Sequence, residues 1–210
     1  MFLWRDFRCL TLLLQIMHSL IIFASGKGSN AKAILEYFKN EGKVKLCLIV
    51  TNNPTAGVLE LAKNENIPTL IIDKNALSED GFIQKLKEHQ PTLIILAGFL
   101  WKIPSNIITA FPRKIINIHP ALLPKYGGKN MYGSKVHQAV LASGDKVSGI
   151  TIHEVDEVYD NGNVLLQATC EVLPSDNENT LAYKIHKLEH YYYPRTIEFL
   201  LHNISGDHTI

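Results

Sequence analysis

The amino-acid sequence predicts an α/β fold: a doubly wound, mostly parallel sheet with helices on both faces. Short, continuously apolar runs alternate with helical patterns between residues 20 and 119. This alternation is typical of parallel strands that are covered on both sides. After residue 134, two strand-like runs follow one another directly. We therefore expect antiparallel strands in the C-terminal part of the sheet.

Each expected element rests on its residue types and their period. The parallel strands are short apolar runs, expected at residues 20–25, 45–51, 69–73, 93–97 and 115–119. The connecting helices show the helical apolar period, and they are expected at residues 30–40, 57–65, 81–89, 105–110 and 135–142. The two later strands are expected at residues 147–156 and 164–172.

A final helix is expected after these strands. Ser175 and Glu178 have the spacing of a capping box, which predicts that the helix begins there. Its apolar positions keep a helical spacing: Leu181, Ile185, Leu188 and Tyr192. One face of this helix is therefore expected to pack on the sheet.

The composition is that of one globular domain. The chain has 210 residues, 46% apolar and 20% charged, which suits a sizeable core. A net charge of +1 gives no overall field that would favour nucleic acid or an acidic membrane. Cys9, Cys47 and Cys170 are scattered without metal or disulfide spacing. We therefore expect a reduced, cytoplasmic protein.

The N-terminal residues allow two interpretations. Early arginines, an apolar run and small residues superficially resemble a signal peptide. The apolar run at residues 20–25 is also the expected first strand, and cleavage after Ser25 would remove it. We therefore expect an extra segment at residues 1–16 before a natural initiator, Met17. The expected divisions are then a single domain over residues 17–203 and a tail over residues 204–210.

The stretch "SGKGSNAKAI" follows the first strand and opens a helix. Backbone N–H groups at a glycine-lined helix start bind anions, and Ser29 and Asn30 add side-chain donors beside Gly28. A tight turn followed by a helix cap, without any bound ligand, explains this sequence pattern about equally well. The stretch also satisfies the dinucleotide pattern G-x-G-x-x-A. That pattern needs an acidic residue after the second strand, where the sequence has Asn52 and Asn53, so a phosphomonoester fits better.

The stretch "HKLEH" satisfies a zinc peptidase pattern, H-x-x-E-H. His186 and His190 could ligate a metal with Glu189 as a base, but a catalytic zinc needs a third protein ligand. The downstream carboxylates, Glu198 and Asp207, are too close to fold back as one. We therefore expect no metal, and a helix that presents a carboxylate and solvated imidazoles.

Asn117 and His119 lie two residues apart at the end of the fifth strand, so their side chains share one face. The loop "HEVDEVYDNGN" could bring Asp160 beside His119. An amide donor, an imidazole and a carboxylate suit attack on a carbonyl carbon with stabilisation of an oxyanion. A satisfied strand-end histidine with solvated loop acids is an equally good explanation from spacing alone.

Four segments together resemble the glycinamide ribonucleotide formyltransferase family of purine biosynthesis. They are "SGKGSN" from Ser25, "LAGFLWKI" from Leu96, "NIHPALLPKY" from Asn117 and "HEVDEVYDNGNVLLQ" from His153. The motif "NIHPALLP" is shared with methionyl-tRNA formyltransferases and formyltetrahydrofolate deformylases. The GSN loop, the chain length and Glu189 favour the first family. A tRNA enzyme would need a further C-terminal domain and a more basic surface.

The resemblance implies a formyltransferase Rossmann-like fold and a role for each motif. Gly28, Ser29 and Asn30 would bind the substrate phosphate, and Glu189 would contact glycinamide ribonucleotide. Asn117, His119 and Asp160 would catalyse direct transfer, with His119 protonated and Asp160 keeping it charged. The co-substrate 10-formyltetrahydrofolate would contact Asn117 and two segments, residues 100–103 and 155–160. These residues are Leu100, Trp101, Lys102, Ile103, Asn117, Val155, Asp156, Glu157, Val158, Tyr159 and Asp160.

The implied partners are these two small molecules, with neither nucleic acid nor a membrane, and the chain would be a monomer or a homodimer. The loop over residues 125–137 is longer than is usual in the family, which predicts Lys129, Met131 and Tyr132 at the pocket rim. A deformylase with the same trio remains an alternative. A phosphate-binding module without catalysis and a dinucleotide oxidoreductase are alternatives from other classes.

Overall fold

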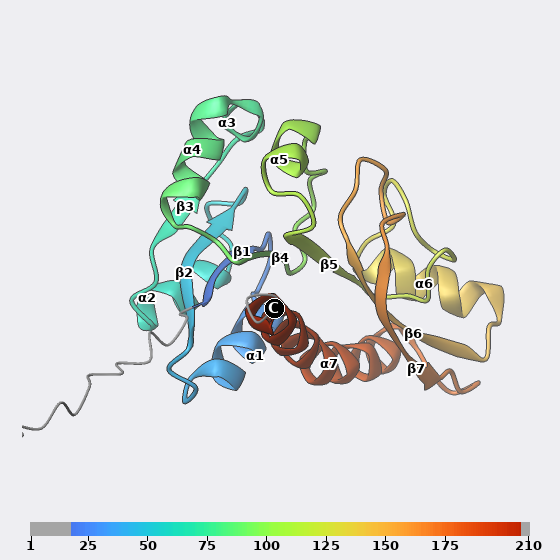
Figure 1. The fold of residues 1–210 in the computed structure, drawn as a ribbon. Helices are drawn as coiled ribbons and strands as arrows, with labels where there is room; N and C mark the ends of the chain where they lie inside the picture. Colours follow the sequence, from blue (N-terminus) through green and yellow to red (C-terminus); the bar gives the residue numbers. More distant parts are fainter. Residues whose placement is uncertain (1–17, 207–210) are drawn as a thin grey trace, which may run out of the picture.

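The computed structural model describes residues 18–206, which form a seven-stranded sheet between two layers of helices (Figure 1). The strands are β1 (His18–Phe23), β2 (Val44–Thr51), β3 (Thr69–Ile71), β4 (Leu93–Leu96), β5 (Ile115–His119), β6 (Val147–Glu154) and β7 (Val164–Glu171). The extra segment predicted at residues 1–16 and the proposed initiator Met17 lie outside the described residues. The predicted fold class is confirmed.

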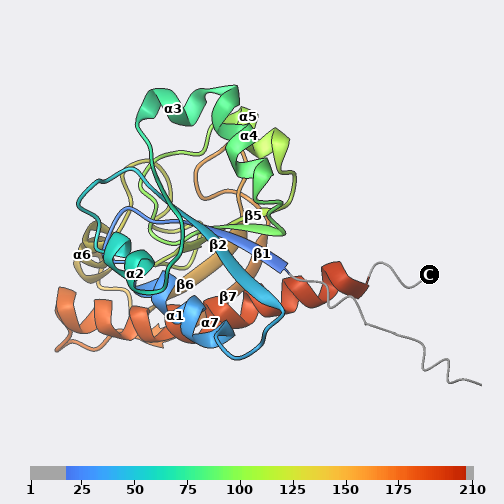
Figure 2. The same cartoon turned by 90° about the vertical axis from the view of Figure 1, so that its left-hand side faces the viewer.

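The helices lie on both faces of the sheet (Figure 2). One face carries α1 (Ser29–Phe38), α2 (Val58–Asn64), α6 (Ser134–Ser143) and α7 (Glu178–Gly206). The other face carries α3 (Lys74–Ser78), α4 (Asp80–Glu88) and α5 (Ser105–Ala110). Each layer buries one apolar stripe per helix against the sheet.

The two cores follow from the period of the strands. Leu20 and Ile22 on β1 join the core beneath α1 and α7, whereas Ile21 and Phe23 join the core beneath α4 and α5. Successive side chains on a strand point to opposite faces. A strand covered on both sides must therefore be apolar throughout, which is why the sequence shows unbroken runs.

The strand order is β3-β2-β1-β4-β5-β6-β7, and the strands β1 to β5 pair with one another in parallel. The order reverses between β1 and β4, and a crevice forms where such a reversal brings strand ends together. The pairs β5–β6 and β6–β7 are antiparallel, as predicted. The β5–β6 register places His153 opposite Asn117.

Three details differ from the sequence-based prediction. The predicted capping box of Ser175 and Glu178 is wrong, because Asn177 accepts hydrogen bonds from the backbone of Asn179 and Thr180, and Thr180 accepts one from Asn177. The short helix α3 was not predicted; its cap, Asp73, accepts from Ala76. Helix α7 continues to Gly206, so residues 204–206 belong to the helix and not to a tail.

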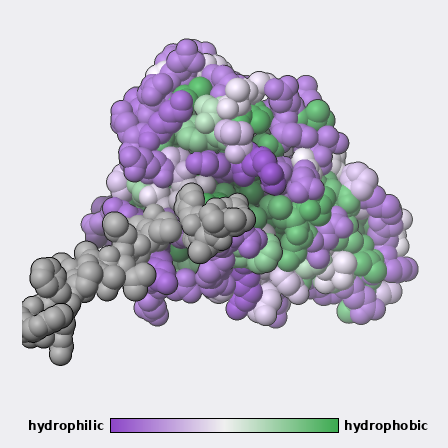
Figure 3. Space-filling model, in the orientation of Figure 1, coloured by the Kyte–Doolittle hydropathy of each residue, from purple (hydrophilic) through white to green (hydrophobic). Residues whose placement is uncertain are grey.

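The surface is divided by hydropathy. Figure 3 shows mainly hydrophilic residues over α3 and α4, and a larger hydrophobic area over β6 and β7, where Val147 and Val164 are exposed. Within residues 18–206, no helix is both long enough and apolar enough to cross a membrane.

Candidate active site

A cavity of about 420 Å³ opens at the carboxyl ends of β1, β4 and β5. Its volume lies in the ordinary range for small-molecule sites. Segments distant in the chain line it: the glycine loop before α1, the loop after β4, the end of β5, the loop before α6, the β6–β7 loop and one turn of α7. Within residues 18–206, the strand-order reversal thus coincides with a cavity that polar side chains from several segments line.

The glycine loop leaves the N-terminus of α1 open toward the cavity. Gly28 precedes the helix in the left-handed conformation, with φ of 78°, and no side chain caps the helix. A Cβ atom on Gly28 would lie 2.7 Å from Val58 Cγ2, so the close approach of α2 also requires glycine. The uncapped N–H groups of a helix start attract an anion. The loop before α1 is therefore a candidate phosphate site.

Glu189 reaches this loop from α7. The amide of Asn30 donates to Glu189 Oε2 at 3.0 Å, and both side chains are buried. Burial raises the pKa of the Glu189 carboxyl to about 7, and the bond from Asn30 opposes that rise. The Oδ1 atom of Asn30 has no partner among the described residues. The pair therefore retains an acceptor and a proton-exchanging carboxyl for a ligand.

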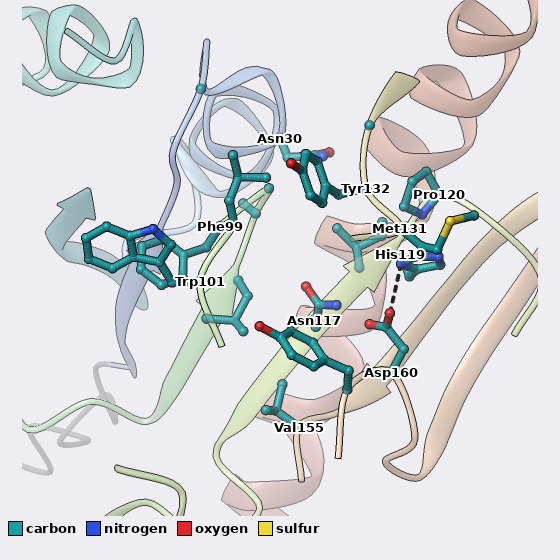
Figure 4. Close-up of a pocket in the computed structure, with 18 of the residues that line it drawn as sticks. Asn30, Phe99, Trp101, Asn117, His119, Pro120, Met131, Tyr132, Val155 and Asp160 are labelled. Atoms are coloured by element: carbon teal, nitrogen blue, oxygen red, sulfur yellow. Dashed lines mark ion pairs between the residues drawn. The ribbon is translucent and has the colours of Figure 1, made fainter. Parts of the chain in front are cut away.

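His119 and Asp160 converge in the cavity (Figure 4). The Nδ1 atom of His119 lies 3.6 Å from Asp160 Oδ2, and its Nε2 atom donates to the carbonyl of Tyr126 at 2.8 Å. The backbone N–H of Gly128 donates to Asp160 Oδ2 at 2.8 Å. With Nε2 engaged, Nδ1 is the ring nitrogen that faces the carboxylate and the cavity.

The surroundings of His119 act on its pKa in opposite directions. Burial lowers the pKa of His119, and the Asp160 carboxylate and the Tyr126 carbonyl act in the opposite direction. The neighbouring His153 adds to the lowering. Without a ligand the neutral imidazole is therefore favoured, with its proton on Nε2, because the Tyr126 carbonyl can only accept.

The side chain of Asn117 is oriented by a residue that the sequence analysis missed. The Asn117 amide donates to His153 Nε2 at 3.1 Å, and His153 Nδ1 donates to the backbone carbonyl of Glu154. His153 Nε2 also lies 3.7 Å from Asp160 Oδ1. The antiparallel register with β5 creates these contacts. The alternation of "ITIHE" was the available signal, but the register could not be read from it.

Almost all of the predicted folate-contacting residues line the cavity; Glu157 is exposed and does not. Lys102 lies over the ring of Tyr159, and Lys74 over the ring of Trp101. The predicted rim residues line the cavity as well: Lys129, Met131 and Tyr132. The phosphate and trio candidates all line it: Gly28, Ser29, Asn30, Glu189, Asn117, His119 and Asp160.

The "HKLEH" stretch lies on α7 beside the cavity. His186 and His190 stack on one another, with ring centroids 6.0 Å apart, whereas Glu189 is turned inward to Asn30. Among residues 18–206, no three or more histidine, cysteine and carboxylate side chains are grouped so that they could hold a metal ion. His186 lines the cavity, as does His137 from α6, which the sequence analysis did not consider.

The arrangement can bind an anion at one end and act on a carbonyl at the other. The Asn117 amide has a second N–H, since only one of its hydrogens faces His153. A donor amide, an imidazole and a carboxylate around one point can stabilise an oxyanion and move a proton. Nucleophilic catalysis would need a serine or a cysteine. Among the described residues that line the cavity, Ser29 in the glycine loop is the one serine, and there is no cysteine.

Comparison with known proteins identifies what the chain is similar to. A sequence profile described as formyl transferase matches residues 18–197. The phosphoribosylglycinamide formyltransferase of Bacillus subtilis (strain 168) is 38% identical over 191 residues, covering 88% of this chain and 95% of that protein. A chloroplastic phosphoribosylglycinamide formyltransferase of Arabidopsis thaliana is 40% identical over 186 residues, covering 85% of this chain.

The chain spans 63% of the length of the Arabidopsis relative and 60% of a Vigna unguiculata relative of the same name. Among solved structures, the phosphoribosylglycinamide formyltransferase from Bacillus halodurans is similar with a TM-score of 0.79 and 33% identity. That match covers 87% of this chain and 95% of the other.

Proposed function

The chain belongs to the formyl transferase family, and we propose that it transfers the formyl group of 10-formyltetrahydrofolate to the amine of glycinamide ribonucleotide. The observation that carries the proposal is the convergence of Asn117, His119 and Asp160 in one cavity with an open glycine loop. The plant and bacterial relatives are named for the same reaction.

The two substrates occupy opposite ends of the cavity. The phosphate of glycinamide ribonucleotide binds at the N-terminus of α1, near Ser29 and Asn30, and its amine end lies near the trio. The folate lies against the segment 100–103 and the loop 155–160, where Trp101 and Tyr159 provide aromatic faces. This placement joins an anionic group to the helix start and a planar ring to an aromatic wall.

The reaction begins with the neutral amine of the ribonucleotide. Its lone pair attacks the formyl carbon, a C–N bond forms, and the electrons of the C=O double bond move to oxygen. The free N–H of Asn117 donates to the developing oxyanion. His119 Nδ1 lies beside the same position, and both the oxyanion and Asp160 raise the pKa of the imidazole. The attacking nitrogen, which is cationic once the C–N bond has formed, passes a proton through the Asp160 carboxylate to His119 Nδ1. The imidazole thereby becomes a charged donor to the oxyanion.

Collapse of the intermediate completes the transfer. The oxyanion re-forms the C=O bond, and its hydrogen bond from the charged His119 is released. The bond from carbon to the folate nitrogen breaks, its electron pair stays on that nitrogen, and the relayed proton is delivered there. No covalent enzyme intermediate is needed, and one proton moves from the amine to the departing folate.

The test is an assay of the purified full chain with both substrates. Formylated ribonucleotide and tetrahydrofolate should appear together in equal amounts. Release of formate with no formylated ribonucleotide would instead identify a deformylase. Binding of the ribonucleotide with no turnover of the folate would reduce the protein to a phosphate-binding module.

We also propose that the protein acts in the cytoplasm on these small molecules, without nucleic acid or a membrane as partner. The scattered cysteines are consistent with a reducing compartment. Cell fractionation locates the protein, and mass spectrometry of the cellular form decides whether residues 1–16 are part of it. Recovery in a secreted or organellar fraction would contradict the proposal.

A further inference from the structure

Two histidines in the cavity take no part in the mechanism above. His137 lies in the first turn of α6, is 4% exposed, and its Nδ1 atom has no hydrogen-bond partner among the described residues. His186 lies on α7, one helical turn before Glu189. Both line the cavity together with Lys27 and Gly28 of the glycine loop. Two helices and a loop therefore surround the candidate phosphate position.

The charges around these imidazoles are unbalanced in the absence of a ligand. Burial lowers the pKa of His137, and so does His186, with Glu178 acting in the opposite direction. Burial lowers the pKa of His186 as well, and Lys27 adds to the effect. His190 stacks on His186 as well. Three cationic or potentially cationic side chains thus meet with little negative charge among them.

The nearby carboxylates already have partners. Glu178 accepts a hydrogen bond from Gln138 at 2.8 Å, and Glu189 accepts one from Asn30. Glu36 acts on His190, on the far side of the stack. An anion that entered the cavity would therefore find donors that no described carboxylate has taken.

We propose that His137 and His186 form a second wall of the phosphate site and bind the substrate phosphate as a pair of imidazolium groups. The proposal rests on the proposed function, because the anion is the phosphate of glycinamide ribonucleotide. A phosphomonoester carries between one and two negative charges near neutral pH. It meets the N–H groups of α1 on one side and the two imidazoles on the other.

Binding is then linked to proton uptake. In the free protein both imidazoles favour the neutral form, and a bound dianion raises the pKa of each. Between the free and bound pKa values, each complex formed takes up protons from the solvent. Below that window the imidazoles are already charged. Above it the charged pair is lost, and the affinity for the ribonucleotide falls as pH rises.

Calorimetry measures this uptake directly. Glycinamide ribonucleotide is titrated into the full chain without folate, near neutral pH, in buffers that differ in ionisation enthalpy. We expect net proton uptake. The matched ligand is glycinamide riboside, which lacks the phosphate. The difference between the two ligands reports the histidine pair together with the ionisation of the phosphate itself, and the histidine variants separate these two contributions.

Variants assign the uptake to residues. His186→Gln changes an exposed side chain, and His137→Gln keeps a polar group in a buried position. Each should reduce the proton uptake and raise KM for the ribonucleotide about tenfold, the effect of one charge-assisted hydrogen bond. The fall in kcat should be smaller than the rise in KM. The matched control is His89→Gln, since His89 lies outside the cavity lining.

The outcomes separate this inference from the function itself. Normal formyl transfer with unchanged proton uptake and KM in His186→Gln would overturn the histidine wall and leave the proposed function intact. Proton uptake that depends on both histidines without formyl transfer would overturn the function and leave the phosphate site. Circular dichroism of His137→Gln checks its folding, and His186→Gln decides the question if that variant is unfolded.

Discussion

The side-chain amide of Asn117 donates to His153 Nε2 across the β5–β6 pair, at 3.1 Å. The other ring nitrogen of His153 donates to the carbonyl of Glu154, which fixes the imidazole as an acceptor toward Asn117. The amide of Asn117 therefore keeps one orientation, with its second N–H directed away from His153. We therefore expect His153 to act by positioning the Asn117 donor.

Removal of this acceptor should slow the reaction without weakening substrate binding. His153→Leu leaves the Asn117 amide without its partner, and we expect kcat to fall about fivefold with little change in KM, since such a bond is worth about 1 kcal/mol. His153→Gln offers an oxygen acceptor and should recover part of the loss. Steady-state kinetics of both variants test this. Equal kcat for Leu and wild type would show that Asn117 is oriented by other contacts.

The carboxylate of Asp160 should be needed for turnover but not for folding. Asp160 has φ of 53°, a conformation that asparagine tolerates, and the amide oxygen of Asp160→Asn can still accept from Gly128. The lost charge removes the group that raises the pKa of His119. We expect kcat to fall by about 100- to 1,000-fold, as for other losses of transition-state stabilisation.

The control for this change is Asp80→Asn, which replaces an exposed carboxylate at the start of α4. Its kcat should equal that of the wild type, and thermal melting should show both variants folded. Near-normal turnover of Asp160→Asn would remove Asp160 from the catalytic trio.

The buried Glu189 should make the protein less stable as pH rises. Its pKa is raised from 4.5 to about 7 in the folded chain, so the folded state holds a proton that the unfolded state releases first. Below the pKa of the unfolded state, the carboxyl is protonated in both states and costs no stability. As pH rises from that value to the pKa of the folded state, the free energy of unfolding declines. Glu189→Gln should escape the decline, which amounts to at most about 3 kcal/mol.

Urea denaturation of both proteins over this pH range measures the effect. The difference in free energy of unfolding between Glu189→Gln and wild type should grow in favour of the variant between the two pKa values. Glu88→Gln, at an exposed position of α4, should show no such growth. A difference independent of pH would mean that the carboxyl of Glu189 is already ionised throughout.

Two glycines of one loop should respond differently to the same added methyl group. Gly28 has a positive φ, and its Cβ would lie 2.7 Å from Val58 Cγ2; a Cβ on Gly26 would have nothing within 4 Å. Gly28→Ala should lower the free energy of unfolding by about 2 kcal/mol or more through left-handed strain and overpacking. Gly26→Ala should change it by about 0.5 kcal/mol or less.

Chemical denaturation measures both changes. Equal stabilities of the two variants would contradict the tight contact between the glycine loop and α2.

Much of the fold could be predicted from local patterns. The strand β5 and the helix α5 have the predicted bounds, because unbroken apolar runs and helical spacing are properties of neighbouring residues. The same is true of Asn117 and His119, whose shared face follows from the period of a strand. The cap of α7 was mispredicted, because Ser175, Asp176 and Asn177 all suit a helix start.

Contacts between distant segments could not be predicted in this way. Asn30 and Glu189 are separated by 159 positions, and the raised pKa of Glu189 exists only because α1 and α7 bury it together. His153 reaches Asn117 through one strand register, and a shift of one residue would turn it to the other face. The amino-acid sequence by itself is sufficient to predict individual strands, turns and candidate site residues. Burial, register and the meeting of charges depend on the packing of the entire sheet, because each arises from surfaces that only the folded chain brings together.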